Sequence, residues 1–474
     1  MVRMENLVVM KFGGSCLKDE KSFSQIHYIV KKYRESSKII IVASALKGIT
    51  DKLIDFYKKS CKEEPKCDYI IDDIFIIHKN VINQILINEE SEFKKAFEFL
   101  KKEIGELKQI GSVIKLIRPS MEIQDIIISY GEKLSTFILS QYLKSKNHKA
   151  KYISSDEILL TDDNFGRAIP LLEESEILVT DKIIPLFQSE LIEIICVTGF
   201  YGSTKDKKIT TFGRGGSDLT AAILAYCLRN NFILKVIYWK NVKGFLNADP
   251  RIAEKTALLK RISYKEAKEL AFFGSKVLHP LCLDVNEKGN IPSEIKFFND
   301  PDSDEFTAIT KEIVRDEKVI KAITSIYKLS MVTVESDTMV PLSGTASKIF
   351  SLLGDNNVNI VFISQSSSEN NITFGIEFED SMKVSFLLRN SDLFGKKWFK
   401  IKIDNDISLV AVIGAGVLHT PGIAGRVFTS LGDGNINIKA IAQGSSELNF
   451  TAIIDRKNCD KAINVLYNEF INQK

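Results

Sequence analysis

Short apolar runs alternate with amphipathic stretches along the first ~300 residues of the chain. Four of the runs are rich in Ile and Val and predict buried strands: residues 7–10, 38–43, 194–198 and 234–238. Apolar residues at helical spacing predict helices in four of the stretches: residues 21–33, 126–144, 218–229 and 264–273. This alternation predicts an α/β fold, a sandwich of helices around a mainly parallel sheet.

Two further stretches indicate how the chain is organised. Residues 60–115 are helical in pattern and strongly charged, which predicts a helical insertion or lid, and we assign no chemistry to them. Residues 299–307, NDPDSDEFT, are polar and rich in turn-forming residues. The sequence therefore predicts a domain boundary at this second stretch.

Beyond this boundary the chain contains an internal repeat. Residues 344–373 align without a gap on residues 422–451, and about half of the positions are identical. Each copy has the pattern strand, glycine turn, helix, strand, polar loop and strand. Since a module of roughly 75 residues buries a poor core alone, we expect the two copies to pack side by side.

The composition is ordinary for a globular protein, and it excludes several classes of function. Of 474 residues, 64 are Lys or Arg and 61 are Asp or Glu, so the formal charge of +3 leaves no basic surface typical of nucleic-acid binding. No run approaches the roughly 18 apolar residues of a membrane span. The seven cysteines form no Cys-x-x-Cys pair and the five histidines lie far apart. We therefore expect a cytoplasmic protein with reduced thiols and no metal site.

A glycine turn follows the first predicted strand. Lys11 and Phe12 precede Gly13, Gly14 and Ser15, and a helix is predicted after them. Two glycines let backbone N–H groups approach a phosphate closely, and the N-terminus of the helix adds a favourable dipole. Lys11 would add a full positive charge. The alternative is a plain strand–helix turn with a solvated lysine, because the segment lacks the Gly-Lys-Ser/Thr ending of a Walker loop.

The strongest local signal is a second glycine loop, TFGRGGSD at residues 211–218, which precedes an apolar helix. Ser217 or Asp218 can cap that helix. Arg214 on such a loop can hold a carboxylate with two parallel hydrogen bonds. Capping alone would not need three glycines and an arginine, so we expect a binding loop.

Several single residues are candidates for a ligand site, each with a plain structural alternative. Ser44 and Thr50 follow the second predicted strand, at the edge where open α/β sheets bind ligands, but they could also be turn residues. Glu132 lies early in a predicted helix and could only balance the helix dipole. Lys276 follows a helix and a glycine, where a charge at the helix C-terminus is the alternative. His279 precedes a proline, and we expect it to be structural.

Taken together, these segments resemble the aspartate kinase family, which has the amino-acid kinase fold. The resemblance covers essentially the whole chain. The motifs occur in the order and spacing of the family: KFGGS at 11–15, GFYGS at 199–203, TTFGRGGSDLTAA at 210–222, NADPR at 247–251 and FGSKVLHP at 273–280. Glutamate 5-kinase, acetylglutamate kinase and UMP kinase share the fold but not this combination.

The resemblance implies a catalytic domain over residues 1–310, followed by two tandem ACT modules of βαββαβ topology. The first module would span residues 328–400. It would be inserted into the second, which would consist of residues 319–327 and 401–474. Pairing of such modules across two chains would give a homodimer or a higher homo-oligomer.

The implied reaction is the transfer of a phosphoryl group from ATP to the side chain of L-aspartate, the first step of lysine, threonine and methionine biosynthesis. The attacking carboxylate has an unperturbed pKa near ~3.9, so it is ionised at neutral pH and needs no general base. The protein must supply positioning and positive charge around the phosphoryl group. By resemblance, Lys11 and Asp218 are the catalytic residues. Mg²⁺ would arrive with ATP, held by phosphates and water rather than by a metal site of the protein.

The resemblance also assigns two substrate pockets. Arg214 would bind the α-carboxylate of aspartate and Glu132 its α-ammonium group. Further aspartate contacts would come from Ser44, Thr50, Phe200 and Ser217. The nucleotide would be bound by Lys11, Gly13, Gly14, Ser15, Lys240, Asn241, Leu246, Asp249, Arg251, Lys276 and Val277.

One departure from the family pattern lies after the fourth predicted strand. Lys240 and Asn241 stand where family members usually carry Thr-Asp. An asparagine can still hydrogen-bond a ribose or an adenine edge, but it brings no charge. We expect ATP binding to persist. The alternative that this departure supports is a degenerate amino-acid sensor with weak or no kinase activity.

The repeated modules point to an allosteric effector. Gln365 and Gln443 begin the segments QSSSE and QGSSE, which resemble the threonine-sensing modules of bifunctional aspartate kinase–homoserine dehydrogenases. Residues 359–362 offer no acid to neutralise the second ammonium group of lysine, so threonine is the expected effector. The alternative is that both glutamines only cap their loops. Without a dehydrogenase half in this sequence, we expect a monofunctional kinase or the product of a split gene.

Overall fold

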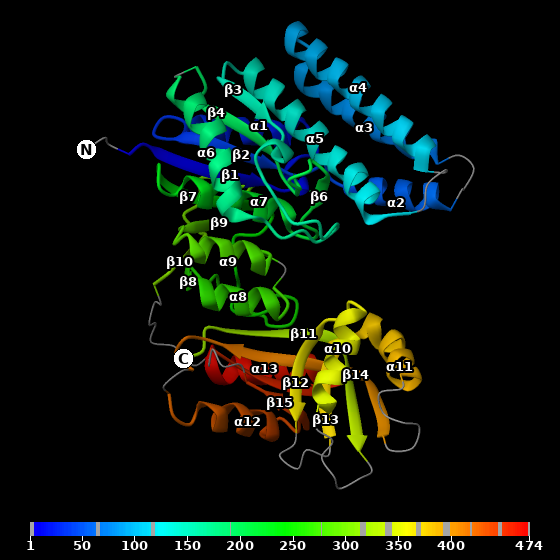
Figure 1. Ribbon diagram of the computed structural model, residues 1–474. Helices are drawn as coiled ribbons and strands as arrows, with labels where there is room; N and C mark the ends of the chain where they lie inside the picture. The colour runs from blue at the N-terminus through cyan, green and yellow to red at the C-terminus, as the bar shows by residue number, and fades with distance from the viewer. Residues whose placement is uncertain are drawn as a thin grey trace. The chain divides into compact units, whose positions relative to one another are not determined.

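The apolar runs of the N-terminal part form one eight-stranded sheet in the computed structural model (Figure 1). Its strand order is β3-β4-β2-β1-β7-β9-β10-β8, and all neighbours are parallel except β9 and β10. The strands are β1 (Asn6–Phe12), β2 (Lys38–Ala43), β3 (Ala150–Ile153), β4 (Ile194–Thr198), β7 (Ile233–Lys240), β8 (Arg261–Ser263), β9 (Ser293–Phe297) and β10 (Thr307–Thr310). The predicted mainly parallel sheet is confirmed, and each of the four predicted runs is one of its strands.

The structure describes residues 4–62, 67–114, 119–189, 191–275, 277–312, 319–336, 344–365, 371–391, 399–417, 420–443 and 448–472. The chain divides into two units. The first unit consists of Met1–Phe245, Lys260–Lys268 and Lys276–Glu312. The second unit consists of Leu246–Leu259, Glu269–Ser275 and Ile313–Lys474.

Helices cover both faces of the eight-stranded sheet. One face shares an apolar core with α1 (Glu20–Tyr33), α2 (Ile49–Cys61), α3 (Asp68–Leu86), α4 (Glu90–Ile114) and α5 (Met121–Ser145). The other face packs against α7 (Gly216–Leu228), which is flanked by α6 (Leu172–Gln188) and α9 (Pro280–Lys288). Along the central strand β1, Val8 and Met10 belong to the core on the first face. Because side chains alternate along a strand, Lys11 points to the side of α7.

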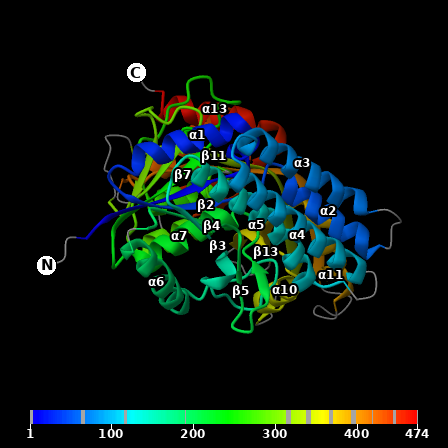
Figure 2. The ribbon, with the colours of Figure 1, turned by 90° about the horizontal axis from the view of Figure 1, so that it is seen from above.

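The charged segment 60–115 forms helices, as its pattern predicts. Helices α3 and α4 lie side by side and pack against α2 and α5 (Figure 2). Ile71 of α3 and Leu100 of α4 are fully buried in the same core as β1. The insertion is therefore an integral part of one face of the sandwich.

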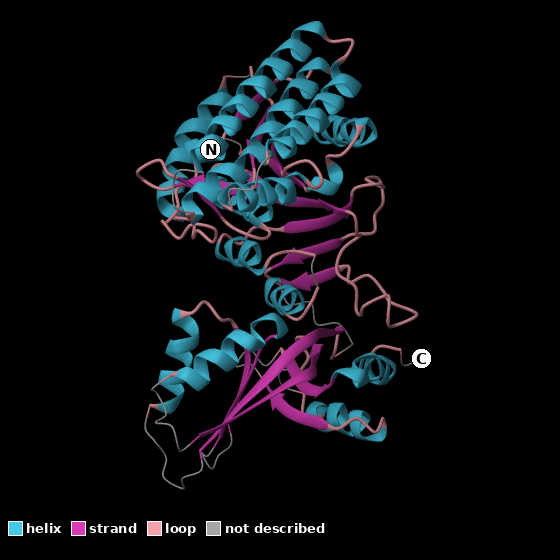
Figure 3. Cartoon of the chain, turned by 90° about the vertical axis from the view of Figure 1, so that its right-hand side faces the viewer, coloured by secondary structure: helices cyan, strands magenta, loops and turns pink. Residues whose placement is uncertain are grey.

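The second unit contains a six-stranded antiparallel sheet of order β12-β13-β11-β14-β16-β15 (Figure 3). Its two central strands, β11 and β14, are long and pair with each other along their length. The strands of the first repeat copy extend one half of the sheet, and those of the second copy extend the other half. The strands are β11 (Ala322–Ser336), β12 (Ile360–Gln365), β13 (Asn371–Glu377), β14 (Phe399–Ile413), β15 (Ile438–Ala442) and β16 (Asn449–Asp455).

Each half of this sheet carries its own pair of helices and its own apolar core. The helices are α10 (Thr345–Asp355) and α11 (Ser381–Asn390) in the first copy, and α12 (Ile423–Asp433) and α13 (Cys459–Phe470) in the second. Gly344 and Gly422 precede α10 and α12 with φ of 81° and 85°. A Cβ at either position would meet no neighbouring atom, so close packing does not require the glycine. The left-handed backbone conformation, which glycine adopts without strain, explains why both copies have it. The predicted side-by-side packing of the two copies is confirmed.

Candidate active site

A cavity of about 360 Å³ opens in the first unit at the carboxyl ends of the strands. Its walls come from the loops after β1, β2 and β4, from α5 and from the loop before α7. The lining residues are Lys11, Gly14, Ser15, Ser44–Gly48, Thr50, Asp51, Glu132, Phe200 and Gly213–Ser217. The structure thus places all six substrate candidates of the sequence around one space: Ser44, Thr50, Glu132, Phe200, Arg214 and Ser217.

The glycine turn after β1 is compact and closely packed. It forms the short 3-10 turn η1 (Gly14–Cys16), in which Cys16 N donates to Gly13 O at 2.8 Å. A Cβ on Gly14 would lie 2.9 Å from the carbonyl oxygen of Ala45, and a Cβ on Gly13 would lie 3.2 Å from Lys11 Nζ. The two glycines therefore let the loop after β2 and the Lys11 ammonium group approach the turn.

The loop before α7 relies on left-handed glycines. Gly213 and Gly215 have φ of 72° and 77°, and the helix begins at Gly216 with Gly215 as its N-cap. The expectation that Ser217 or Asp218 caps the helix was wrong, because both residues lie within its first turn. Their side chains are thereby free to face the cavity and its surroundings.

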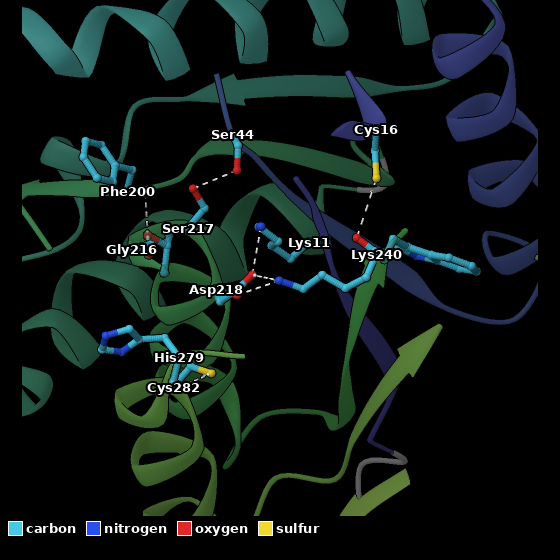
Figure 4. Close-up of polar contacts among 12 residues, drawn as sticks. Lys11, Cys16, Ser44, Phe200, Gly216, Ser217, Asp218, Lys240, His279 and Cys282 are labelled. Carbon is cyan, nitrogen blue, oxygen red and sulfur yellow. Dashed lines mark hydrogen bonds and ion pairs between the residues drawn. The ribbon is translucent and has the colours of Figure 1, made fainter. Parts of the chain in front are cut away.

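Two hydrogen bonds accepted by side chains of α7 join this helix to residues of the cavity wall. Ser44 Oγ donates to Ser217 Oγ at 2.9 Å, which joins the loop after β2 to α7 (Figure 4). Phe200 has a φ of 79°, which is unusual for a residue with a side chain. Its backbone N–H donates to Thr220 Oγ1 at 3.0 Å, a bond that fixes this conformation next to Gly216.

Sequence reasoning missed Asp125, the residue that fastens the second glycine loop. This fully buried side chain on α5 accepts hydrogen bonds from Gly166 N at 2.7 Å, Thr211 N at 2.8 Å and Thr211 Oγ1 at 2.7 Å. It thereby joins α5 to the strand β6 (Ile209–Thr211) that leads into the loop. An acidic residue near a helix start is ordinary in sequence, so only the long-range contacts reveal its role.

Lys11, Asp218 and Lys240 form a buried cluster beside the cavity (Figure 4). Lys11 Nζ lies 2.8 Å from Asp218 Oδ1, and Lys240 Nζ lies 2.7 Å from Oδ2 and 3.0 Å from Oδ1. Burial opposes ionisation of Asp218, but the two ammonium groups outweigh it and hold the pKa of this carboxyl below its ordinary value. We therefore treat Asp218 as a carboxylate at neutral pH.

Glu132 is a buried acid on the cavity wall. Burial raises its pKa to about 8, against the opposing effects of a backbone hydrogen bond from Ala45 and of the charge of Lys11. Its Oε2 has no hydrogen-bond partner among the described residues. A cationic group in the cavity would supply that partner and favour the ionised form.

The remaining nucleotide candidates lie in several places. Asn241 is exposed after β7, and Val277 is partly buried. Asp249 Oδ2 accepts from Arg251 Nη2 at 2.6 Å within the second unit, to which Leu246 also belongs. Lys276 lies outside the described residues.

His279 accepts a hydrogen bond from Leu281 N and caps α9, so the expected structural role is confirmed.

The two effector candidates occupy matched positions in the repeat. Gln365 ends β12 and Gln443 follows β15, and both side chains are exposed. These strands are the two edges of the six-stranded sheet, and they approach each other. The rest of QSSSE and QGSSE, residues 366–369 and 444–447, lies outside the described residues.

Two general features concern the described part of the chain as a whole. Its helices include none with the length and apolar character needed to cross a membrane. Across the same residues, no group of three or more His, Cys, Asp or Glu side chains is placed to hold a metal ion.

Comparison with protein families gives two matches. Residues 6–296 match the amino acid kinase family, and residues 332–389 and 410–470 each match an ACT domain. A bifunctional aspartokinase/homoserine dehydrogenase of Buchnera aphidicola is 32% identical, over 98% of this chain and 57% of that protein. The chain spans little more than half the length of the curated relatives of this kind that it matches.

Solved structures share the fold over nearly the whole length of the chain. An aspartate kinase of Clostridium acetobutylicum has a TM-score of 0.76 and 28% identity, with 98% of this chain and 100% of that chain covered. E. coli aspartokinase III in complex with aspartate and ADP has a TM-score of 0.81 at 24% identity, with coverage of 98% and 100%. The second likeness concerns the fold alone.

Proposed function

The chain belongs to the amino acid kinase family, and from this premise we propose that it is an aspartate kinase, which transfers the γ-phosphoryl group of ATP to the side-chain carboxylate of L-aspartate. The observation that carries the proposal is the charge pattern of the cavity. Arg214, Glu132 and Lys11 line one space, and Lys11 is paired with Asp218. Arg214 matches the α-carboxylate and Lys11 the incoming phosphoryl group, while Glu132 is an acid that the α-ammonium group would ionise.

Arg214 and Glu132 would select an amino acid by its two main-chain charges. Arg214 lies on the loop at the exposed side of the cavity, where its planar guanidinium group can grip a carboxylate bidentately. Glu132 is buried, and one of its oxygens has no partner within the described part of the chain, so an ammonium group would satisfy it. The side-chain carboxylate of aspartate is then the group left to face Lys11.

The phosphoryl transfer needs positive charge rather than a base. The attacking carboxylate is ionised at neutral pH, so the protein has to position it and to neutralise the charge of the phosphoryl group in transit. Lys11 would contact that group, and Asp218 would hold the lysine in place through the 2.8 Å ion pair. The glycine turn at residues 13–15 would present backbone N–H groups to the phosphates.

Asp218 does not provide a metal site in this arrangement. Both of its oxygens are engaged by lysine ammonium groups. We therefore propose that Mg²⁺, when it is bound, comes with ATP and is held by phosphate oxygens and water. In that complex the metal supplies additional charge neutralisation on the phosphates.

An amino-acid panel tests the proposed substrate. ADP release from ATP should depend on L-aspartate and should be absent with L-glutamate, D-aspartate and L-asparagine. Asparagine lacks the second carboxylate, and the extra methylene of glutamate moves its carboxylate away from Lys11. Release of ADP with another acid but not with aspartate would contradict the proposed substrate, and no amino-acid-dependent release would favour the degenerate sensor.

We further propose that threonine binds the repeated modules and inhibits the enzyme. The support is the matched placement of Gln365 and Gln443 at the two edges of one sheet, where each side-chain amide offers a donor and an acceptor. An effector inhibits only as far as it prefers the inhibited state. Titration of the activity with threonine and with lysine tests this proposal, and inhibition by lysine alone would contradict it.

A further inference from the structure

Lys240 is the last residue of β7 and lies inside the buried cluster, against Asp218. Its ammonium group contacts both oxygens of Asp218, while Lys11 contacts one of them. The exposed fractions of the side chains are 8% for Lys11, 5% for Asp218 and 17% for Lys240. Two cations therefore share a single carboxylate in a place largely closed to water.

This cluster carries an excess positive charge. Two ammonium groups and one carboxylate would leave +1, and an uncompensated charge is costly in a buried site. Burial therefore lowers the pKa of the Lys240 ammonium group from its ordinary value, although Asp218 opposes this effect, and an anionic ligand would favour the charged form. Three further titratable groups nearby, within the described part of the chain, do not supply the missing negative charge. Burial raises the pKa of Glu132 to about 8, and it also raises the pKa of the Cys16 and Cys282 thiols, so all three are mainly neutral at pH 7. The positive charge of the cluster thus favours the binding of an anionic ligand.

The sheet register puts Lys240 beside the glycine turn. Phe12 of β1 is level with Trp239 of β7, so Gly13 and Lys240 follow at the same edge of two paired strands. Cys16 Sγ donates to the carbonyl oxygen of Trp239 at 3.6 Å, which links the turn to the end of β7. Lys240 and Lys11 therefore approach Asp218 from neighbouring strands, next to the loop suited to phosphate.

We propose that Lys240 is a second phosphate-binding lysine, which is held by Asp218 in the free protein and contacts the terminal phosphates of the nucleotide when that is bound. This inference rests on the proposed kinase function and adds a residue to its phosphate site. In the complex, the phosphates provide the negative charge that the cluster lacks. Lys11 and Lys240 would then neutralise the phosphoryl group from two sides, with Asp218 between them as the positioning residue.

Binding of inorganic tripolyphosphate, measured by titration calorimetry, tests the inference without aspartate or catalysis. Lys240→Met should weaken tripolyphosphate and ADP binding by roughly 10- to 100-fold, because it removes a charge-assisted contact. Lys240→Arg should retain most of the affinity. Lys243→Met is the matched control: that lysine lies three residues on, is exposed and pairs with Glu305, so its loss should leave binding unchanged.

Steady-state kinetics give a second readout. Lys240→Met should raise the KM for ATP and lower kcat, while the KM for aspartate stays near that of the wild type. If Lys240→Met does not fold, Lys240→Gln, which keeps a polar contact to Asp218 without the charge, takes its place with the same expectation. Wild-type affinity for tripolyphosphate in the folded variant would overturn the inference.

The two experiments separate this inference from the proposed function. A wild-type chain that phosphorylates aspartate, together with a Lys240→Met variant that binds tripolyphosphate normally, would leave the function standing and refute the role of Lys240. A chain that binds tripolyphosphate through Lys240 but does not phosphorylate aspartate would refute the proposed acceptor and support the phosphate site.

Discussion

At the scale of single residues, the candidate site is a set of charges whose protonation states are set by burial and by each other. Lys11 and Lys240 keep Asp218 ionised, so that Asp218 can hold them in place. Burial keeps Glu132 mainly protonated below about pH 8. A charged cluster thus lies beside the cavity, and the cavity wall carries one acid that a cationic ligand would ionise.

Removing the Lys11 charge should slow the chemistry without unfolding the protein. Lys11→Met should lower kcat by at least ~10²-fold, because its ammonium group acts mainly on the charge of the transition state. Lys18→Met, an exposed lysine soon after the same turn, is the control and should keep the wild-type kcat. A wild-type kcat in Lys11→Met would remove Lys11 from the mechanism.

Glu132 should make aspartate binding depend on pH. Because the carboxylate form binds the α-ammonium group and its pKa in the free protein is about 8, the KM for aspartate should fall as the pH rises from 6 to 8 and then level off. Glu132→Gln should raise this KM and remove its pH dependence over the same interval. A KM in the wild type that does not change with pH would contradict the assignment.

The same acid should also affect stability. Its folded-state pKa lies above the ordinary value of 4.5, so the folded protein binds the extra proton and loses stability as the pH rises toward 8. Glu132→Gln removes that loss. The Tm of the variant should therefore exceed that of the wild type at pH 8. The difference in Tm should be smaller at pH 5, as measured by thermal unfolding.

At the scale of elements, the site depends on loops that are fastened to helices far away in sequence. Asp125 of α5 holds Thr211 and Gly166, and the φ of Gly213 and Gly215 sets the path of the loop that carries Arg214. A Cβ on Gly215 would lie 2.5 Å from His279 Cβ, so α9 also limits that path. Three parts of the structure therefore fix the position of Arg214: Asp125 on α5, the glycines of the loop itself and the start of α9.

Loss of the Asp125 carboxylate should loosen this loop. Asp125→Ala leaves the buried backbone N–H of Thr211 and the partly buried N–H of Gly166 without their acceptor, which should cost on the order of 2–5 kcal/mol of stability. It should also raise the KM for aspartate, since Arg214 is no longer held in place. Asp163→Ala, an exposed acid nearby in sequence to Gly166, is the control for both measurements. Equal urea midpoints of the two variants would contradict the role of Asp125.

Much of the fold could be predicted from the sequence, because local patterns decide it. The Ile- and Val-rich runs became β1, β2, β4 and β7, and the aligned repeat became two copies of the same elements at the two halves of one sheet. The contacts of Asp125 and Lys240 could not be predicted, because they depend on tertiary register. The capping of α7 was mispredicted because a left-handed Gly215 took the place of a side-chain cap.

At the scale of the whole molecule, the chain combines a sandwich of the amino acid kinase family with a sheet built from two ACT domains. The duplication gives the second unit two equivalent glutamines, at Gln365 and Gln443. Regulation would then arise because threonine binds one state of the protein better than another.

Substitution of these glutamines should separate regulation from catalysis. Gln365→Ala and Gln443→Ala should each weaken inhibition by threonine and leave the uninhibited activity unchanged. Lys461→Ala, an exposed residue on α13, should keep wild-type inhibition. Undiminished inhibition in both glutamine variants would place the effector elsewhere.

The central claim, transfer of a phosphoryl group to the side-chain carboxylate of aspartate, is tested most directly by trapping the product. An acyl phosphate reacts with hydroxylamine, so incubation of the protein with ATP, L-aspartate and hydroxylamine should give aspartate β-hydroxamate, identified by mass spectrometry. The same incubation with L-glutamate should give no hydroxamate. Absence of the aspartate β-hydroxamate while ADP is released, or formation of the hydroxamate from glutamate instead, would contradict the account.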